Sequence, residues 1–319
     1  MADITASMVK ELRERTQAGM SDCKAALVEA GGDMEKAVDT ILKKGIVKAA
    51  ARAGRVATEG EVRTSVSNEG KHGTIVEVNC QTDFVSRGEA FRAFVHAVLE
   101  SAKTLQNGGD LGAHKFHGTA QTVDQARQEI VGKTGENMVV RRFAHVESKG
   151  LNGVVHSYVH MGGKIGVLVE ADVHDVATKT NADFKSFIDG VAMQIASMNP
   201  RAVRREDIAK PEVDKQREIL TAQFKEEQTA LPTEKQKPEA MWGKILDGKV
   251  NKWLDEVTLL GQDYVVEAGK GTVEAVRKEV SSKVGGDVRL LSFVRFELGE
   301  GIEKKTDDLA AEVAKLTGG

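Results

Sequence analysis

Two stretches of this sequence repeat each other at a fixed distance, and the repeat constrains the fold more than any other feature does. "GKHGTIVE" at residues 70–77 matches "GKIGVLVE" at 163–170, and "FRAFVHAV" at 91–98 matches "FKSFIDGV" at 184–191, both at an offset of 93 residues. Alternating apolar residues in the first pair are typical of a strand, and the apolar spacing of the second is typical of a helix. We therefore expect two copies of one strand-then-helix unit.

Further β-rich runs complete each copy. A run at 60–66 precedes the first repeated strand and a run at 154–160 precedes the second, so a hairpin is expected to lead into each helix. "MVVRRFAHVE" at 138–147 and "RLLSFVRFEL" at 289–298 supply a closing strand for each copy. The sequence therefore predicts an α+β fold with two related sheet-and-helix subdomains.

The first 45 residues predict three short helices. Thr5 can cap the first helix, Gly19 ends it, and the third helix is expected to end at Gly45. So small a unit buries little core, and we expect it to pack on a partner or on the neighbouring domain. The basic stretch that follows, from Lys43 to Arg55, is interpreted as a solvated linker, with an RNA contact as the alternative.

A helical hairpin is predicted as an insertion into the second copy. Residues 212–228 and 241–257 have apolar residues at helical spacing, and the segment between them, 231–238, contains two prolines. Both tryptophans of the chain, Trp242 and Trp253, lie on the returning arm. The apolar residues of the hairpin either pack against the body of the protein or form a surface for a partner.

Composition excludes several classes of protein. Lys and Arg total 45 against 48 Asp and Glu, a net charge of -3, so there is no overall basic field for nucleic acid or an anionic membrane. The two cysteines, Cys23 and Cys80, form no disulfide framework, as is usual in a reducing cytosol. We find no signal peptide and no apolar run of about 18 residues, so the expectation is a cytoplasmic protein with protein partners.

The segment "NCQTDF" at 79–84 places a phenylalanine between a strand and a helix. Ser86 and Glu89 have the spacing of a capping box, which predicts that the helix begins at Ser86 and leaves Phe84 outside it. Val85 would then act as the hydrophobic staple, and later phenylalanines of the helix would supply its core contacts. Phe84 either folds back on its own core or is an exposed anchor for another protein, and the anchor is favoured.

The repeat provides an internal control for this segment. At the offset of 93, Asp83 falls on Val176 and Phe84 falls on Ala177, so the tip is absent from the second copy although the scaffold is repeated. A feature that served only to connect strand and helix should occur in both copies. This difference favours a role for Asp83 and Phe84 in binding another protein and not in stabilising this one.

Enzymatic alternatives fail on spacing. "GKT" at 132–134 has Arg127 where a phosphate loop needs glycine. Cys80 carries no signature of an activated thiol and alternates onto the core face of its strand. His114 and His117 lie in a Gly-rich loop, 105–121, that offers no clear third metal ligand. We therefore expect no covalent catalysis, no cofactor and no metal.

Several motifs resemble those of bacterial elongation factor Ts, the nucleotide exchange factor of the translational GTPase EF-Tu. They are "ITASMVKELRERTQAGMSDCKAAL" at 4–27, "VNCQTDFVSR" at 78–87 and "VRFELGEGIEK" at 294–304, and the order of elements also agrees. The resemblance implies a ubiquitin-associated-like (UBA-like) module, two related core halves, a coiled-coil hairpin and a carboxy-terminal helix at 307–316. The expected units are 1–55 (module and linker), 56–150 (first core half), 151–210 and 259–300 (second core half), 211–258 (hairpin) and 301–319 (carboxy-terminal module).

The resemblance also implies a mechanism and a set of contact residues. Phe84 would enter an apolar cleft between helices of EF-Tu while Asp83 meets polar groups beside it, which disturbs the Mg²⁺ and nucleotide site and releases GDP. The partner-binding residues implied are Thr82, Asp83, Phe84 and Val85, with Arg13, Met20, Lys24, His160, Val265 and Val266 as further contacts. The proline that the family has near Val265 is absent here. The hairpin could add affinity or self-association, and one-to-one and two-to-two assemblies both remain open; no direct contact with nucleic acid is expected.

Overall fold

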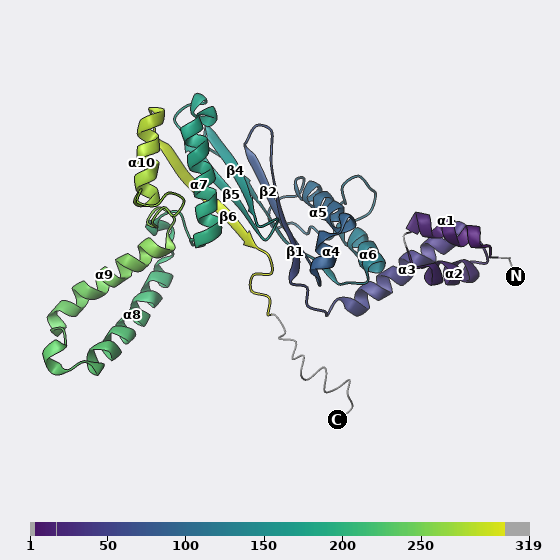
Figure 1. Ribbon diagram of the computed structural model, residues 1–319, viewed down its shortest axis with the longest axis horizontal. Helices are drawn as coiled ribbons and strands as arrows, with labels where there is room; N and C mark the ends of the chain where they lie inside the picture. Colours follow the sequence, from purple (N-terminus) through teal and green to yellow (C-terminus); the bar gives the residue numbers. More distant parts are fainter. Residues whose placement is uncertain (1–3, 17, 304–319) are drawn as a thin grey trace.

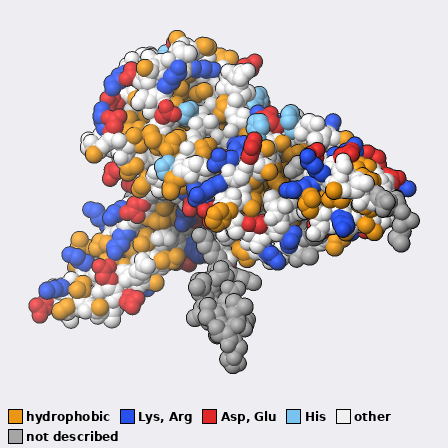
Figure 2. All heavy atoms as spheres, turned by 45° about the vertical axis from the view of Figure 1, so that its right-hand side comes forward, with side chains coloured by type: hydrophobic (Ala, Val, Ile, Leu, Met, Phe, Trp, Pro, Cys, Tyr) orange, Lys and Arg blue, Asp and Glu red, His pale blue; other side chains and the backbone are white. Residues whose placement is uncertain are grey.

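The computed structural model describes residues 4–16 and 18–303, which form an α+β molecule with two three-stranded antiparallel sheets. Figure 1 shows the sheets in the middle of the molecule, with helices on their outer sides, a small helical module at one end and a helical hairpin that projects from the other. The predicted α+β class is confirmed at this level. Figure 2 shows charged side chains of both signs interspersed over the surface, in keeping with the nearly balanced composition.

The amino-terminal module consists of α1 (Ala6–Thr16), α2 (Met20–Glu29) and α3 (Met34–Arg52). The hydroxyl of Thr5 accepts a hydrogen bond from the backbone N–H of Met8 at 3.3 Å, as expected of a cap. A small apolar core holds the three helices together. Its fully buried members are Leu12, Cys23, Ala26, Leu27 and Ala37.

Helix α3 does not end at Gly45, so that prediction was wrong. It continues to Arg52 and packs against α6 (Val123–Thr134), where a Cβ atom on Gly132 would lie 3.2 Å from the Cα of Gly45. The two glycines therefore allow the helix backbones to approach closely. The packing of α3 on α6 offsets the low helix propensity of Gly45. The stretch interpreted as a linker is helical as far as Arg52, and it joins the module to the neighbouring domain.

The first core half contains β1 (Glu59–Val66), β2 (His72–Cys80) and β3 (Met138–Glu147), with β2 in the centre. Helices α5 (Glu89–Ala102) and α6 cover its outer face. The segment between these helices, which includes the Gly-rich loop, contributes Leu111 and Phe116 to the same core.

The second half repeats this plan with β4 (Gly153–His160), β5 (Ile165–Val173) and β6 (Val288–Glu297), covered by α7 (Ala182–Met198) and α10 (Val273–Val284). A short 3-10 helix, η1 (Ala177–Thr180), precedes α7. Even an irregularity recurs: the central strand shifts register between Glu77 and Val78 in the first half and between Glu170 and Ala171 in the second. The repeat in the sequence therefore corresponds to a repeat in strand pairing.

The two sheets pack face to face through a pair of equivalent glycines. A Cβ atom on Gly73 would lie 2.7 Å from Val155, and one on Gly166 would lie 2.6 Å from Val62. Both the glycines and the valines are related by the offset of the repeat. The N–H groups of these valines also donate across the interface, Val62 to the carbonyl of Gly163 at 2.8 Å and Val155 to that of Gly70 at 2.7 Å. The halves thus meet through a near-symmetric contact that only glycine permits.

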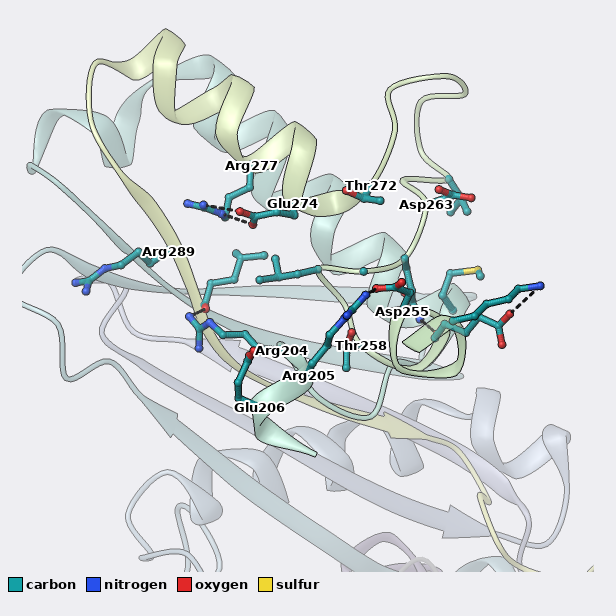
Figure 3. A pocket seen from close by; sticks show the side chains of 18 of the residues that line it. Arg204, Arg205, Glu206, Asp255, Thr258, Asp263, Thr272, Glu274, Arg277 and Arg289 are labelled. Atoms are coloured by element: carbon teal, nitrogen blue, oxygen red, sulfur yellow. Dashed lines mark hydrogen bonds and ion pairs between the residues drawn. The ribbon is translucent and has the colours of Figure 1, made fainter. Parts of the chain in front are cut away.

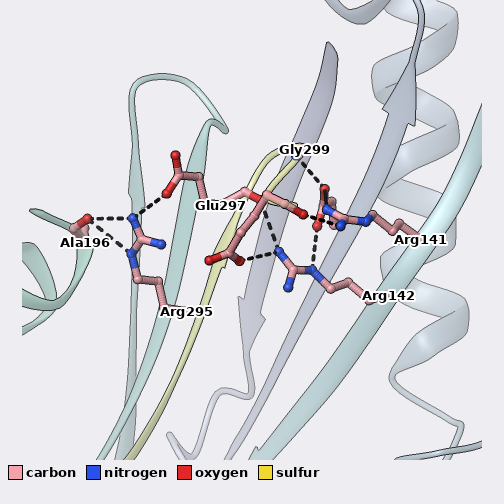
Figure 4. Close-up of polar contacts among 8 residues, drawn as sticks. Arg141, Arg142, Ala196, Arg295, Glu297 and Gly299 are labelled. Carbon is pink, nitrogen blue, oxygen red and sulfur yellow. Dashed lines mark hydrogen bonds and ion pairs between the residues drawn. The ribbon is translucent and has the colours of Figure 1, made fainter. Parts of the chain in front are cut away.

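A buried carboxylate ties the end of β6 to the first half (Figure 4). Glu77 is fully buried and accepts hydrogen bonds from Arg141 at 2.9 Å, Arg142 at 2.6 Å and the backbone N–H of Gly299 at 2.8 Å. Burial opposes ionisation of Glu77, but these three donors together keep its pKa below the ordinary value. The network holds residues 299 and 300 on β3, since both arginines also bond to Glu300.

The inserted hairpin consists of α8 (Lys210–Ala230) and α9 (Glu239–Val257), with a 3-10 turn, η3 (Thr233–Lys235), at its tip. Trp242 packs edge-on against Phe224 of the other arm, with the ring centroids 5.4 Å apart. The indole N–H of Trp242 donates to the carbonyl of Lys237. Figure 1 shows the hairpin extending away from the sheets. Its coiled-coil character stays a prediction, and the expected helix at 307–316 lies outside the described residues.

Candidate functional site

The segment around Phe84 forms a short helix of its own, which corrects the expectation that the helix begins at Ser86. Helix α4 (Asp83–Arg87) starts directly after Thr82, and Gly88 separates it from α5 with an extended backbone, φ -67° and ψ 143°. Ser86 does not cap a helix, because its hydroxyl donates to the carbonyl of Asp83 at 3.0 Å. Phe84 therefore lies in the first turn of α4 and not in a loop before a helix.

Glu136 decides where α4 begins, and its role was not foreseen from the sequence. Its carboxylate accepts a hydrogen bond from the N–H of Thr82 at 3.0 Å and another from the Thr82 hydroxyl at 2.6 Å. The same hydroxyl accepts from the N–H of Val85, as an N-cap does, at 3.4 Å. Glu136 follows Gly135, which ends α6 with φ 78°. In the sequence, the signal for this role is Gly135, which is typical of a helix end, followed directly by the carboxylate of Glu136.

Phe84 points away from the protein's own core. Its side chain is 86% exposed, while Val85 beside it packs on the core of the first half. Asp83 is paired with Arg87 one turn later at 2.9 Å. The alternative in which Phe84 folds back on its own core is therefore wrong. The arrangement presents an aromatic ring and a carboxylate on a short helix whose start is held by Glu136 and whose Val85 packs on the core.

The rival chemical sites have no support in the geometry. Burial, together with the nearby carboxylates of Glu136 and Glu59, raises the pKa of Cys80 to about 12, so the thiol stays protonated at neutral pH. Gly132 to Thr134 form the last residues of α6 and not a phosphate loop. Within 4–16 and 18–303 no group of three or more His, Cys, Asp or Glu side chains is suited to hold a metal ion.

The expected amino-terminal contacts lie on a separate part of the molecule. Arg13 on α1 and Lys24 on α2 are exposed, and Met20, the first residue of α2, is 50% exposed beside the buried Cys23. Figure 1 shows α1 and α2 at the far end of α3 from α4. These side chains are accessible but lie away from α4.

The expected contacts in the second half lie on its loops and strand ends. His160 ends β4, and its Nδ1 lies 2.8 Å from the hydroxyl of Tyr158. Val265 and Val266 are both exposed in the loop between α9 and α10. The side chain of Gln194, fully buried on α7, accepts the N–H of Val265 at 3.0 Å and donates to the carbonyl of Asp263 at 3.0 Å. Gln194 thus fixes the loop, a role that helical periodicity alone does not reveal.

Val265 borders a groove of about 1120 Å³ at the base of the hairpin (Figure 3). Every Arg and Lys side chain that lines the groove is paired with a carboxylate. The pairs are Arg204–Asp207, Arg205–Asp255, Lys252–Glu256, Arg277–Glu274, Arg277–Asp287 and Arg289–Asp172. Positive charge in the groove is therefore neutralised internally, which does not favour a phosphate ligand.

Among the residues that the structure describes, we find no helix with the length and apolar character of a membrane span.

Comparison with known proteins gives one consistent family. The family model described as "Elongation factor TS" matches residues 81–300. The relative from Symbiobacterium thermophilum named elongation factor Ts is 43% identical and aligns over 100% of this chain and 99% of its own length. Proteins of the same name from Nitratiruptor sp. and Clostridium perfringens are 44% and 42% identical, over 98% and 99% of this chain and the same shares of their own lengths.

Proposed function

The chain belongs to the elongation factor Ts family of translation elongation factors, and from this premise we propose that it promotes release of GDP from EF-Tu. The observation that carries the proposal is the exposed ring of Phe84 on the braced helix α4. No bond is made or broken in such a reaction. The factor binds the nucleotide-free GTPase more tightly than the loaded one.

The thermodynamics of the proposed exchange are reciprocal. If the factor weakens GDP binding by a given ratio, GDP weakens binding of the factor by the same ratio, so abundant GTP displaces the factor and reloads the GTPase. Insertion of Phe84 between helices of EF-Tu would shift the Mg²⁺ site, and loss of Mg²⁺ would leave phosphate charge uncompensated. Asp83 would meet polar groups beside the inserted ring.

The magnitude indicates that Phe84 cannot act alone. Burial of one Phe side chain contributes about 1.5 to 3 kcal/mol, which corresponds to roughly a tenfold to hundredfold shift in a local equilibrium. The remaining contacts proposed are Arg13, Met20 and Lys24 on the amino-terminal module, and His160, Val265 and Val266 on the second half. They lie far apart on the molecule, which suits a partner of several domains.

Other parts of the proposal concern assembly and location. We propose that the hairpin adds affinity or mediates self-association, and that the protein works in the cytoplasm with the translation machinery. The domain limits given above stay a proposal. Binding of nucleic acid is not expected from a chain whose net charge is -3.

Release of fluorescent GDP from a matching EF-Tu tests the proposal. The wild-type protein should accelerate release at amounts far below those of EF-Tu, and the double variant Asp83→Ala, Phe84→Ala should be slower by at least about tenfold. Both side chains are largely outside the core, so the double variant should keep the wild-type unfolding midpoint. Equal release rates for the two proteins would remove Phe84 and Asp83 from the mechanism.

A further inference from the structure

The turn between β4 and β5 contains a methionine in a conformation that favours glycine. Met161 has φ 49°, in the left-handed region, and is followed by Gly162 and Gly163 with φ 64° and 101°. A side chain with a Cβ atom is strained in this region, whereas glycine is not. The side chain of Met161 is 71% exposed, so packing within the protein offsets little of the strain.

The first half shows that the scaffold does not require this strain. At the offset of 93, Met161 corresponds to Asn68 and Gly163 to Gly70. Within the described residues the corresponding turn has a positive φ only at Gly70, and Asn68 is an ordinary residue there. Both turns close equivalent hairpins, so left-handed backbone at position 161 is a property of this turn and not of the repeated fold.

Met161 borders the same cleft as Phe84. The cleft has a volume of about 610 Å³, and α4 forms one wall while the β4–β5 turn forms the other. The turn is fixed to the first half, because the carbonyl of Gly163 accepts the N–H of Val62 at 2.8 Å and a Cβ atom on Gly163 would lie 2.6 Å from Glu61. Phe84 and Met161 therefore belong to opposite halves of the molecule but line the same cleft.

The charges in the cleft indicate what a ligand segment should carry. Lys164 is paired with Glu59 at 2.6 Å, and Asp83 is paired with Arg87 at 2.9 Å. Arg92 of α5 also lines the cleft, and none of the described residues offers it a carboxylate within salt-bridge distance. A segment with apolar side chains and one acidic side chain would complement this surface.

We propose that Met161 is a second apolar anchor for the GTPase partner, opposite Phe84, and that the cleft between them holds one partner segment whose acidic side chain pairs with Arg92. This inference rests on the proposed function and extends it to a residue on the other half of the molecule. In this proposal the strained backbone of Met161 has a function, because the left-handed conformation directs the Met161 side chain toward the partner. Met161 contributes to binding and not to displacement of Mg²⁺.

The decisive variant is Met161→Gly, which removes the side chain and relieves the backbone strain together. Its unfolding midpoint should equal or exceed that of the wild type, while kcat/KM for release of fluorescent GDP from EF-Tu should fall about tenfold through a higher KM. Leu151→Ala is the matched control. Leu151 is 91% exposed just before β4 begins, at the opposite end of the strand from Met161, and the variant should exchange nucleotide at the wild-type rate.

Charge reversal tests the second half of the proposal. Arg92→Glu should lower the association rate with EF-Tu, most strongly at low salt, and Met161→Gly should leave the salt dependence unchanged. Equal effects of salt on the wild type and on Arg92→Glu would rule out the proposed pair.

Affinity for EF-Tu stripped of nucleotide separates this inference from the proposed function. If the wild type binds stripped EF-Tu but does not accelerate GDP release, the proposed function fails, and weaker binding by Met161→Gly would still support the anchor. If Met161→Gly binds within about twofold of the wild type, the anchor is overturned whatever the release assay shows. Failure of the wild type to bind would overturn both.

Discussion

Glu77 is the residue on which the junction of the two halves depends most. Its counterpart at the offset of the repeat is Glu170, which accepts hydrogen bonds from the hydroxyl of Ser292 at 2.7 Å and the N–H of Lys149 at 3.4 Å. Each glutamate thus receives a backbone N–H from the segment that follows the last strand of the other half. The difference lies in the side-chain partners, which are two arginines for Glu77 and one hydroxyl for Glu170.

Glu77→Gln should therefore lower the free energy of unfolding by about 3 kcal/mol at neutral pH, because it removes the buried negative charge that Arg141 and Arg142 share. The folded-state pKa of Glu77 lies below its ordinary value of 4.5, so its stabilisation is complete above that value and is lost as the pH falls through the folded-state pKa. The difference in the free energy of unfolding between wild type and Glu77→Gln should therefore decrease at acidic pH. Urea unfolding at stepped pH measures it; a difference that grows in acid would contradict this prediction.

Glu170→Gln is the control within the same molecule. Because its side-chain partner is a neutral hydroxyl, the substitution should cost only about 1 kcal/mol. Equal losses for Glu77→Gln and Glu170→Gln would show that the arginines contribute nothing beyond an ordinary hydrogen bond.

At the scale of elements, α4 is too short to be stable by itself, since a helix of five residues lies far below the length at which isolated helices form. Its order comes from the bonds between Thr82 and Glu136 and from the packing of Val85. The orientation of Phe84 therefore depends on a residue that need not touch the partner. This makes Glu136 a positioning residue.

Glu136→Ala should release the start of α4 while the rest of the protein stays folded. We expect the amides of residues 84–87 to exchange hydrogen faster, the free energy of unfolding to fall by only about 1 to 2 kcal/mol, and nucleotide release to slow about fivefold. Hydrogen exchange followed by mass spectrometry resolves the local effect. Glu136→Gln, which keeps one acceptor, should recover part of the activity; unchanged protection of α4 in Glu136→Ala would refute the role assigned to Glu136.

At the scale of the whole molecule, the two halves meet through equivalent glycines, Gly73 and Gly166. The limits proposed for the first core half, 56–150, and for the second, 151–210 and 259–300, therefore separate segments that share one interface. Val62, Ile75, Val155 and Leu168 form an apolar cluster between the sheets. The spacing of the sheets at this point is set by the missing side chains of Gly73 and Gly166. Each half therefore depends on the other to cover one face of its sheet.

Gly73→Ala and Gly166→Ala should each destabilise the protein by about 1 to 3 kcal/mol, because the new Cβ atom would overlap a valine of the opposite sheet. Adding Val155→Ala to Gly73→Ala should restore part of the loss, since it removes the methyl group at 2.7 Å. Gly248→Ala on α9, with nothing within 4 Å of the new atom, is the control and should not destabilise. Denaturant unfolding of these four variants and of Val155→Ala alone compares them; a loss in the double variant equal to the sum of the two single losses would argue against the contact.

Much of the fold could be predicted because its signals are local or recur at a fixed distance. The closing strand expected at 138–147 coincides with β3, and the strand expected at 154–160 differs from β4 by one residue. Alternation of apolar and polar residues, together with the repeat, is sufficient to predict such strands, because the two-residue period of a strand involves only residues close together in the sequence. The exposure of Phe84 was also predictable, since the second half lacks a counterpart.

The errors share one cause, which is a partner distant in the sequence. Helix α3 passes Gly45 because Gly132 faces it, and α4 begins at Asp83 because Glu136 holds Thr82, 54 residues away. Local capping rules favoured Gly45 as a stop and Ser86 as a start, and tertiary contacts overrode both. Gln194 was missed for the same reason, since its bonds reach a loop about seventy residues later.

The sequence by itself determined the α+β class, the duplicated core and the family, because periodicity and motifs depend on covalent order. Only the tertiary structure decided that Phe84 stands on a helix braced by Glu136, and that Met161 of the other half faces the same cleft. Such juxtapositions arise from packing between distant segments, where backbone approach and buried hydrogen bonds outweigh local preference.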